Sequence, residues 1–162
     1  MTDSRKAQEI IHNHALAAAG LGIPGSFIPM ADMGGMAVIW GKMILELADE
    51  SGHAVDAAYG TKLATSVLSG VTLYIGGSKA MTWLLHFILP GVGTLTAAAI
   101  NAMFNWMYTL RLGKLIAKHF EQPGFHADSF LLVAKGFASL VFALPTLGEF
   151  KEAFEAIGHL LG

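Results

Sequence analysis

Apolar residues recur at helical spacing along most of the chain. Between residues 32 and 50 they follow one another at intervals of three and four, at Met33, Met36, Ala37, Trp40, Met43, Ile44 and Leu47. This period places them on one face and predicts a helix over Asp32–Glu50. Asp32 can cap that helix and complement its dipole. The pattern as a whole predicts an all-α protein.

A proline–glycine pair interrupts the first apolar stretch. Proline lacks a backbone donor and clashes with the preceding turn, so a helix ends or kinks there. We therefore expect a short helix over Arg5–Leu21, a break at Pro24 and Gly25, and a loop held open by Pro29.

A second break of the same kind lies near the middle of the chain. It contains Pro90, Gly91 and Gly93. The pattern predicts a short helix over Ser78–Leu89 before this break and a long helix over Thr94–Glu121 after it.

The two halves of the chain repeat one another. Gly41-Lys42-Met43-Ile44 matches Gly113-Lys114-Leu115-Ile116, 72 residues later, and Gly52 and Gly124 end the two long helices at the same offset. These matches predict an internal duplication, which is common in membrane folds. The alternative is that any two apolar helices with Pro-Gly breaks align in this way.

The duplication sets the predicted domain organisation. A helical membrane domain covers residues 1–145, with repeats over 5–77 and 78–145, each closing with an apolar helix (Val55–Ile75 and Asp128–Leu144). An amphipathic C-terminal helix follows over 146–162, where Thr146 and Glu149 form a capping box. We expect that helix to pack on the body, with a membrane-interface position as the alternative.

The low proportion of charged residues indicates that part of the protein is surrounded by lipid rather than by water. Charged residues make up 14% of the chain, and hydrophobic residues 54%, whereas an ordinary globular domain has about 25% charged residues. The uncharged stretch Ala80–Leu110 is longer than the roughly 20 residues of one membrane span. We therefore predict a membrane-embedded bundle with transmembrane helices, in which the Pro-Gly breaks are tips of helical hairpins.

Three polar residues stand out in the long second helix. Asn101, Asn105 and Thr109 lie four residues apart and form one stripe. Buried amides without partners are costly, so the stripe should face another helix, a further copy or a water-filled cavity. One expectation is a contact or central cavity in a homo-oligomer. The other is packing inside the monomer against a second stripe, Thr65, Ser69 and Thr72.

Candidate chemistry is sparse. His86 lies in an uncharged segment, where a satisfied buried histidine is favoured over a metal ligand or proton relay. The loop histidines His53, His119 and His126 are expected to be solvated. We expect no enzyme activity, no metal and no cofactor, and the net charge of −2 argues against nucleic acid.

The sequence resembles a known family. Pro29-Met30-Ala31-Asp32, followed by Trp40-Gly41-Lys42-Met43-Ile44, and later Leu89-Pro90-Gly91-Val92-Gly93, is similar to the YcjF-type uncharacterised membrane-associated domain found with Era-like bacterial GTPases. The likeness covers about Ile10 to Glu121. It implies helices, membrane association and a GTPase on a separate chain, because no phosphate-binding loop is present here.

Together these features predict a small integral protein of a bacterial inner membrane. It would self-assemble as a homo-oligomer and act as a scaffold or pore-like element, with lipid as its surroundings. The alternative is a soluble or peripheral helical module that binds a protein partner, such as a separate GTPase chain.

Overall fold

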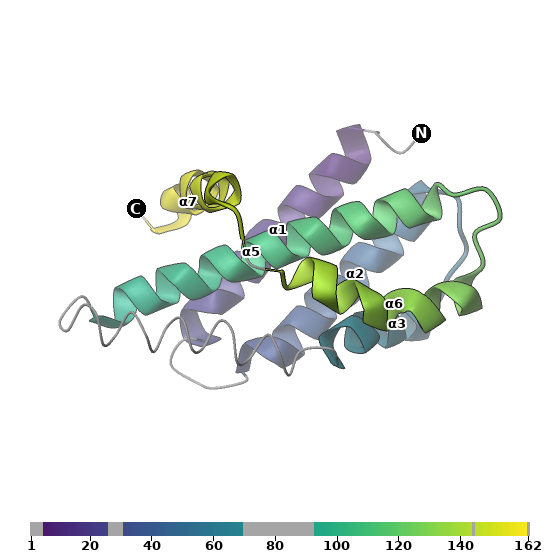
Figure 1. Ribbon diagram of the computed structural model, residues 1–162, viewed down its shortest axis with the longest axis horizontal. Coiled ribbons are helices and arrows are strands. Elements are labelled where there is room, and N and C mark those ends of the chain that lie inside the picture. The colour runs from purple at the N-terminus through teal and green to yellow at the C-terminus, as the bar shows by residue number, and fades with distance from the viewer. Residues whose placement is uncertain (1–4, 26–30, 70–92, 144, 162) are drawn as a thin grey trace.

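The protein is a bundle of helices. The computed structural model describes residues 5–25, 31–69, 93–143 and 145–161, and within these ranges it contains no strand. The helices are α1 (Arg5–Gly25), α2 (Ala31–Glu50), α3 (Ala57–Ser69), α5 (Gly93–Phe120), α6 (Ala127–Val141) and α7 (Leu147–Leu161) (Figure 1). The predicted all-α class is confirmed.

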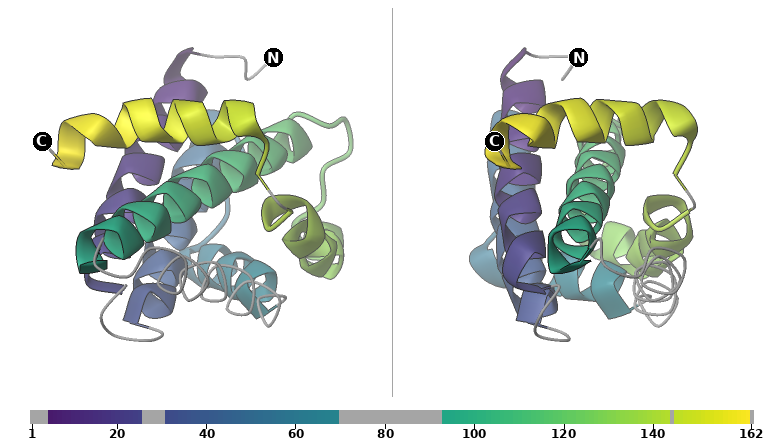
Figure 2. Two further views of the ribbon diagram at one scale, coloured as in Figure 1. Left: turned by 60° about the vertical axis from the view of Figure 1, so that its left-hand side comes forward. Right: turned by 90° about the vertical axis from the view of Figure 1, so that its left-hand side faces the viewer.

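Helix α5 is the centre of the bundle. It is 28 residues long, and every residue from Asn101 to Thr109 is buried. It packs against α1, α2, α6 and α7 (Figures 1 and 2). A helix covered on all sides by protein needs no polar face, which accounts for the absence of charge between Ala98 and Leu110.

Helix α1 runs antiparallel to α5. Gly22, near the end of α1, lies against Ala102, whereas Ile11 lies against Gly113, eleven residues further along α5. Helix α1 also packs on α2, where Lys6 Nζ is 2.7 Å from Glu50 Oε2. Helices α5 and α2 therefore both run in the opposite direction to α1.

The α2–α3 pair is joined at two glycines. A Cβ atom added to Gly60 would lie 2.8 Å from the carbonyl oxygen of Gly41, so the two backbones touch. Helix α3 in turn packs against α6, and the Tyr59 hydroxyl donates to the carbonyl oxygen of Ala127 across that contact at 3.2 Å.

Helices α2 and α5 are followed by similar turns. Gly52 has φ 76° and Gly124 has φ 78°. Glycine adopts this left-handed region without a steric penalty and commonly terminates helices there. The sequence predicted both terminations, while the duplication of the two halves stays a prediction.

The first predicted break needs correction. Helix α1 continues past Leu21 and ends at Gly25, so Pro24 and Gly25 belong to its last turn. A proline there removes one backbone bond at the point where the helix already ends, which is tolerated. Gly93 opens α5, whereas Pro29, Pro90, Gly91 and the predicted Ser78–Leu89 helix lie outside the described residues.

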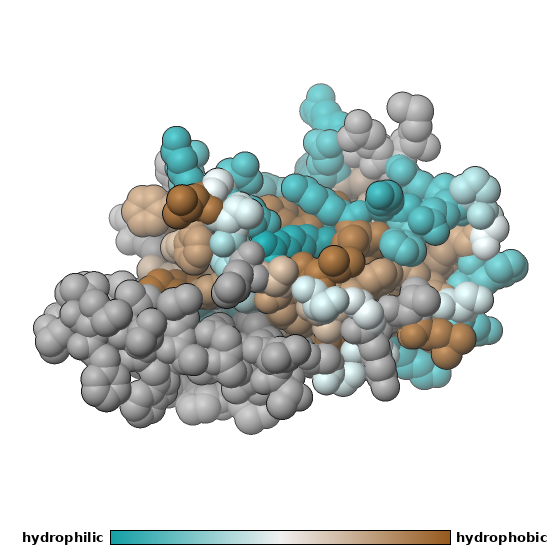
Figure 3. Space-filling model, viewed as in Figure 1, coloured by the Kyte–Doolittle hydropathy of each residue, from teal (hydrophilic) through white to brown (hydrophobic). Residues whose placement is uncertain are grey.

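The predicted transmembrane helices are not supported by α1–α3 or α5–α7. Over the described ranges, no helix is both long enough and apolar enough to cross a membrane. On the coloured part of the face in Figure 3, apolar residues lie in separate patches between polar ones. Residues 70–92, which hold much of the uncharged sequence, are outside the described part.

Candidate functional site

Buried amides of α5 bond to the backbone of α1. Asn101 Nδ2 donates to the carbonyl oxygen of Gly22 at 2.8 Å, and Asn105 Nδ2 donates to that of Ala18 at 3.2 Å. The Gly22 carbonyl is one of the last four in α1, which lack a donor within the helix. Asn101 therefore caps the C-terminal end of α1 from another helix.

Thr109 continues the same polar row. Its hydroxyl donates to the carbonyl oxygen of Asn105 at 2.7 Å and accepts a bond from Trp40 Nε1 of α2 at 2.8 Å. Asn105, Thr109 and Trp40 are fully buried. The row thus connects α1, α5 and α2, and the part played by Trp40 was not predicted from the sequence.

Small residues allow this contact. A Cβ atom added to Gly22 would lie 2.5 Å from the backbone nitrogen of Ala102. Ala18 and Gly22, like Ala98 and Ala102, are small residues four positions apart, a spacing that permits close helix approach. This spacing was the sequence signal that could have identified the α1–α5 interface, by which we mean these residues with Asn101 and Asn105.

The polar stripe therefore faces a helix of its own chain. It meets α1 rather than the α3 residues proposed for it. Thr65 and Ser69 are exposed, and their hydroxyls bond back to carbonyl oxygens of α3. Thr72 lies outside the described residues, and assembly between copies is not tested by this arrangement.

The histidines lie at separate places. His53, expected to be solvated, instead packs between Phe120 and Phe125 and has Nε2 2.7 Å from the carbonyl oxygen of Phe120. His119 bonds to its own helix through the carbonyl oxygen of Leu115. Among the described residues no group of three or more His, Asp or Glu could hold a metal ion. His86 is outside them.

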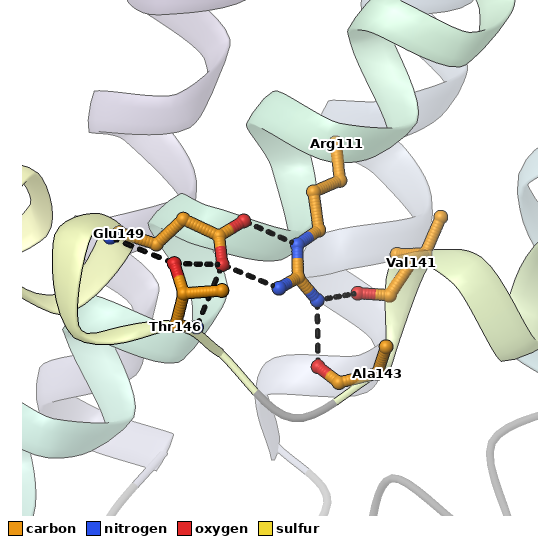
Figure 4. Close-up of polar contacts among 5 residues, drawn as sticks. All are labelled: Arg111, Val141, Ala143, Thr146 and Glu149. Carbon is orange, nitrogen blue, oxygen red and sulfur yellow. Dashed lines mark hydrogen bonds and ion pairs between the residues drawn. The ribbon is translucent and has the colours of Figure 1, made fainter.

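An arginine of α5 holds the start of α7 (Figure 4). Arg111 Nε and Nη2 donate to the two carboxylate oxygens of Glu149 at 2.8 and 2.7 Å, and Nη1 donates to the carbonyl oxygens of Val141 and Ala143. The predicted capping box is present, with Thr146 N donating to Glu149 Oε2 at 2.8 Å. The Arg111 guanidinium lowers the pKa of Glu149 to about 2.

The apolar residues of α7 lie on two faces of the helix. Ala153 and Ile157 are buried against the body, whereas Leu147 is 90% exposed and Phe154 67% exposed. Figure 2 shows α7 lying across α1 and α5, which contact it. One face of the helix therefore packs on the bundle, and a neighbouring face carries large apolar side chains to the surface.

A groove of about 1050 Å³ lies between the first turns of α1 and the last turns of α5. Its floor is apolar and includes Ala7, Ile11 and Ala117, all buried. Its rim carries charges of both signs, from Arg5, Lys114, Lys118, Glu9 and Glu121. We call this the α1–α5 groove. No sequence motif indicated it, because its two sides are about 100 residues apart.

Comparison with known proteins gives a family. The family model described as "Domain of unknown function (DUF697)" matches residues 2–134. Magnetosome membrane protein 22 of Magnetospirillum gryphiswaldense is 26% identical over 118 residues, which is 73% of this chain and 59% of that relative. No solved structure matches. A link to YcjF-type domains and GTPases stays a prediction.

The family match begins before α1 and ends within α6, so it includes every residue of the α1–α5 interface and both sides of the groove. Helix α7 lies beyond it. The chain belongs to the DUF697 family.

Proposed function

We propose that this protein is a membrane-associated helical scaffold that assembles with further copies of itself. The observation that carries the proposal is its similarity to a protein named for the magnetosome membrane. The chain covers 59% of that relative, so the relative's full role is not transferred. Low charge, at 14% of residues, supports a partly apolar environment.

The geometry favours a scaffold over a pore. A channel would need polar side chains along its wall. The polar row of Asn101, Asn105 and Thr109 instead forms hydrogen bonds that hold α1, α5 and α2 together. Contacts with other molecules must then come from the surface. There the described part offers the α1–α5 groove and the exposed apolar side chains of α7, including Leu147 at 90% and Phe154 at 67% exposure.

Membrane fractionation of the untagged protein tests the first half of the proposal. We expect it to sediment with membranes and to remain there after a carbonate wash. Release by carbonate would indicate a peripheral module, and recovery in the soluble fraction before the wash would overturn membrane association. Light scattering of the detergent-solubilised protein tests assembly, and a monomeric mass would contradict it.

A further inference from the structure

The α1–α5 groove has the character of a site for a helix. Its apolar floor can bury a row of apolar side chains, as helix-binding grooves do. Its volume of about 1050 Å³ exceeds most small-molecule pockets, which measure about 300–1,000 Å³. Both signs of charge on the rim suit a polypeptide better than a phosphate, because Glu9 and Glu121 would repel an anion.

The rim charges are available for a partner. Within the described ranges, none of Arg5, Glu9, Lys114, Lys118 and Glu121 forms an ion pair with another residue. Three of the five are cationic and two are acidic, so the rim favours an occupant with a slight excess of acidic side chains.

Helix α7 carries a surface of that description. Leu147, Lys151, Phe154 and Gly158 are exposed and lie along one face at spacings of three and four, which we call the outer stripe of α7. Glu152 and Glu155 are also exposed beside Lys151. The helix therefore shows apolar side chains flanked by two acidic groups and one basic group. Lys151 and Glu155 form an exposed ion pair with each other at 3.9 Å, and Glu149 is paired with Arg111.

The two surfaces also agree in spacing. Leu147 and Phe154 are seven residues apart, and so are Leu110 and Ala117, which line the groove. Seven residues of helix span about 10 Å, or nearly two turns. Leu147 and Phe154 of α7 can therefore enter the spaces beside Leu110 and Ala117 of α5, as side chains of one helix enter the grooves of another.

We propose that the outer stripe of α7 from one copy docks in the α1–α5 groove of a second copy. This deepens the assembly part of the proposed function and rests on it. The contact joins two different surfaces, so each copy keeps one groove and one α7 free for the next. Repeated head to tail, this contact forms a ring or an open filament, whereas two copies that exchange α7 reciprocally form a closed dimer.

Cross-linking between two single-cysteine proteins tests the contact. The chain has no cysteine, so Phe154→Cys and Gln8→Cys, the latter on the groove rim, each introduce one thiol without altering a rim charge. A bismaleimide with a flexible spacer should link them when the two proteins are mixed, and far less when either is treated alone. Leu132→Cys, at a leucine of α6 that is more exposed than Phe154, is the matched control and should not link to Gln8→Cys.

Three outcomes overturn the inference: no mixed product, a product formed equally well by the Leu132→Cys control, or linkage of Phe154→Cys mainly to itself. A second measurement does not depend on the cysteines. Phe154→Glu should lower the light-scattering mass to that of a monomer without changing the unfolding temperature, whereas Leu132→Glu should leave the mass unchanged. An unchanged mass in Phe154→Glu would contradict the contact.

Membrane retention of the same variants separates the two proposals. If the two cysteine variants do not cross-link but the protein stays in the membrane fraction after the carbonate wash, the α7–groove contact is refuted and membrane association still holds. Cross-linking of a protein that is recovered in the soluble fraction before the wash would support the contact and refute membrane association.

Discussion

Helices α1 and α7 both pack on α5, but they are held there in different ways. At the α1–α5 interface the backbones touch, and buried amides bond to carbonyl groups of Gly22 and Ala18. Helix α7 is held instead by a part-exposed ion pair and by the contact of Phe150 with Phe104. The first arrangement depends on shape and tolerates no added volume. The second combines apolar packing, with Ala153 and Ile157 also buried, and an ion pair whose contribution should respond to pH.

The strongest way to break the α1–α5 interface is to add one methyl group. Gly22→Ala would place a Cβ atom 2.5 Å from backbone of α5, which cannot move aside as a side chain can. We expect a loss of about 3 kcal/mol in the free energy of unfolding, the upper end of overpacking effects. Denaturant unfolding followed by circular dichroism measures it.

Gly20→Ala is the matched control on the same helix. A Cβ atom there meets nothing within 4 Å, so higher helix propensity should leave the protein equal or more stable, by up to about 1 kcal/mol. Equal losses in both variants would refute the close contact.

Removing the amides tests the same interface without touching α1. Replacing Asn101 and Asn105 together by leucine deletes two buried hydrogen bonds, each worth about 1 kcal/mol. We expect a loss of about 2 kcal/mol in unfolding free energy and an unchanged mass by light scattering. A changed mass with unchanged stability would show that the stripe serves contacts between copies.

A double-mutant cycle sharpens the account of the polar row. Thr109→Val keeps the shape of the side chain but leaves Trp40 Nε1 buried without an acceptor, which should cost about 1–2 kcal/mol. In a Trp40→Phe background the same change should cost clearly less, because no donor is left unpaired. Additive losses would mean that the bond contributes nothing to stability.

The smallest effect is expected at α7 and depends on pH. The pKa of Glu149 is lowered from 4.5 to about 2 in the folded protein, so its contribution is complete above about pH 4.5 and is lost as the pH falls towards 2. Because the pair is partly exposed, we expect only about 1 kcal/mol. Unfolding of Glu149→Gln, which retains a capping-box side chain, should lose this pH dependence, and an unchanged profile would contradict it.

Helical period and termination signals predicted most of the local structure. Asp32–Glu50 and Thr94–Glu121 agree with α2 and α5 to within one residue at each end. Gly52, Gly124 and the Thr146–Glu149 capping box end or begin helices as expected. These features depend on neighbouring residues alone, so a single sequence contains the information for them.

The relation between helices was harder to predict. The helical period of the sequence shows that Asn101 and Asn105 share a face of α5, but it does not show which helix that face contacts. Gly41 and Gly113 align in sequence, yet Gly41 meets Gly60 of α3 and Gly113 meets Ile11 of α1. A helix buried among other helices and a helix buried in lipid both contain few charged residues. The composition of α5 therefore could not distinguish a central helix from a membrane span.

The bond from Asn101 to Gly22 joins residues 79 positions apart, and this separation has a consequence for the order of folding. At translation speeds of about 5–20 residues per second, Asn101 follows Gly22 out of the ribosome after roughly 4–16 s. Throughout that interval the Gly22 carbonyl of α1 lacks the Asn101 amide that donates to it, and the alanines of α1 lack the α5 surface that covers them. Nascent chains should therefore hold an undocked α1, open to chaperones or to other chains, until α5 has been synthesised.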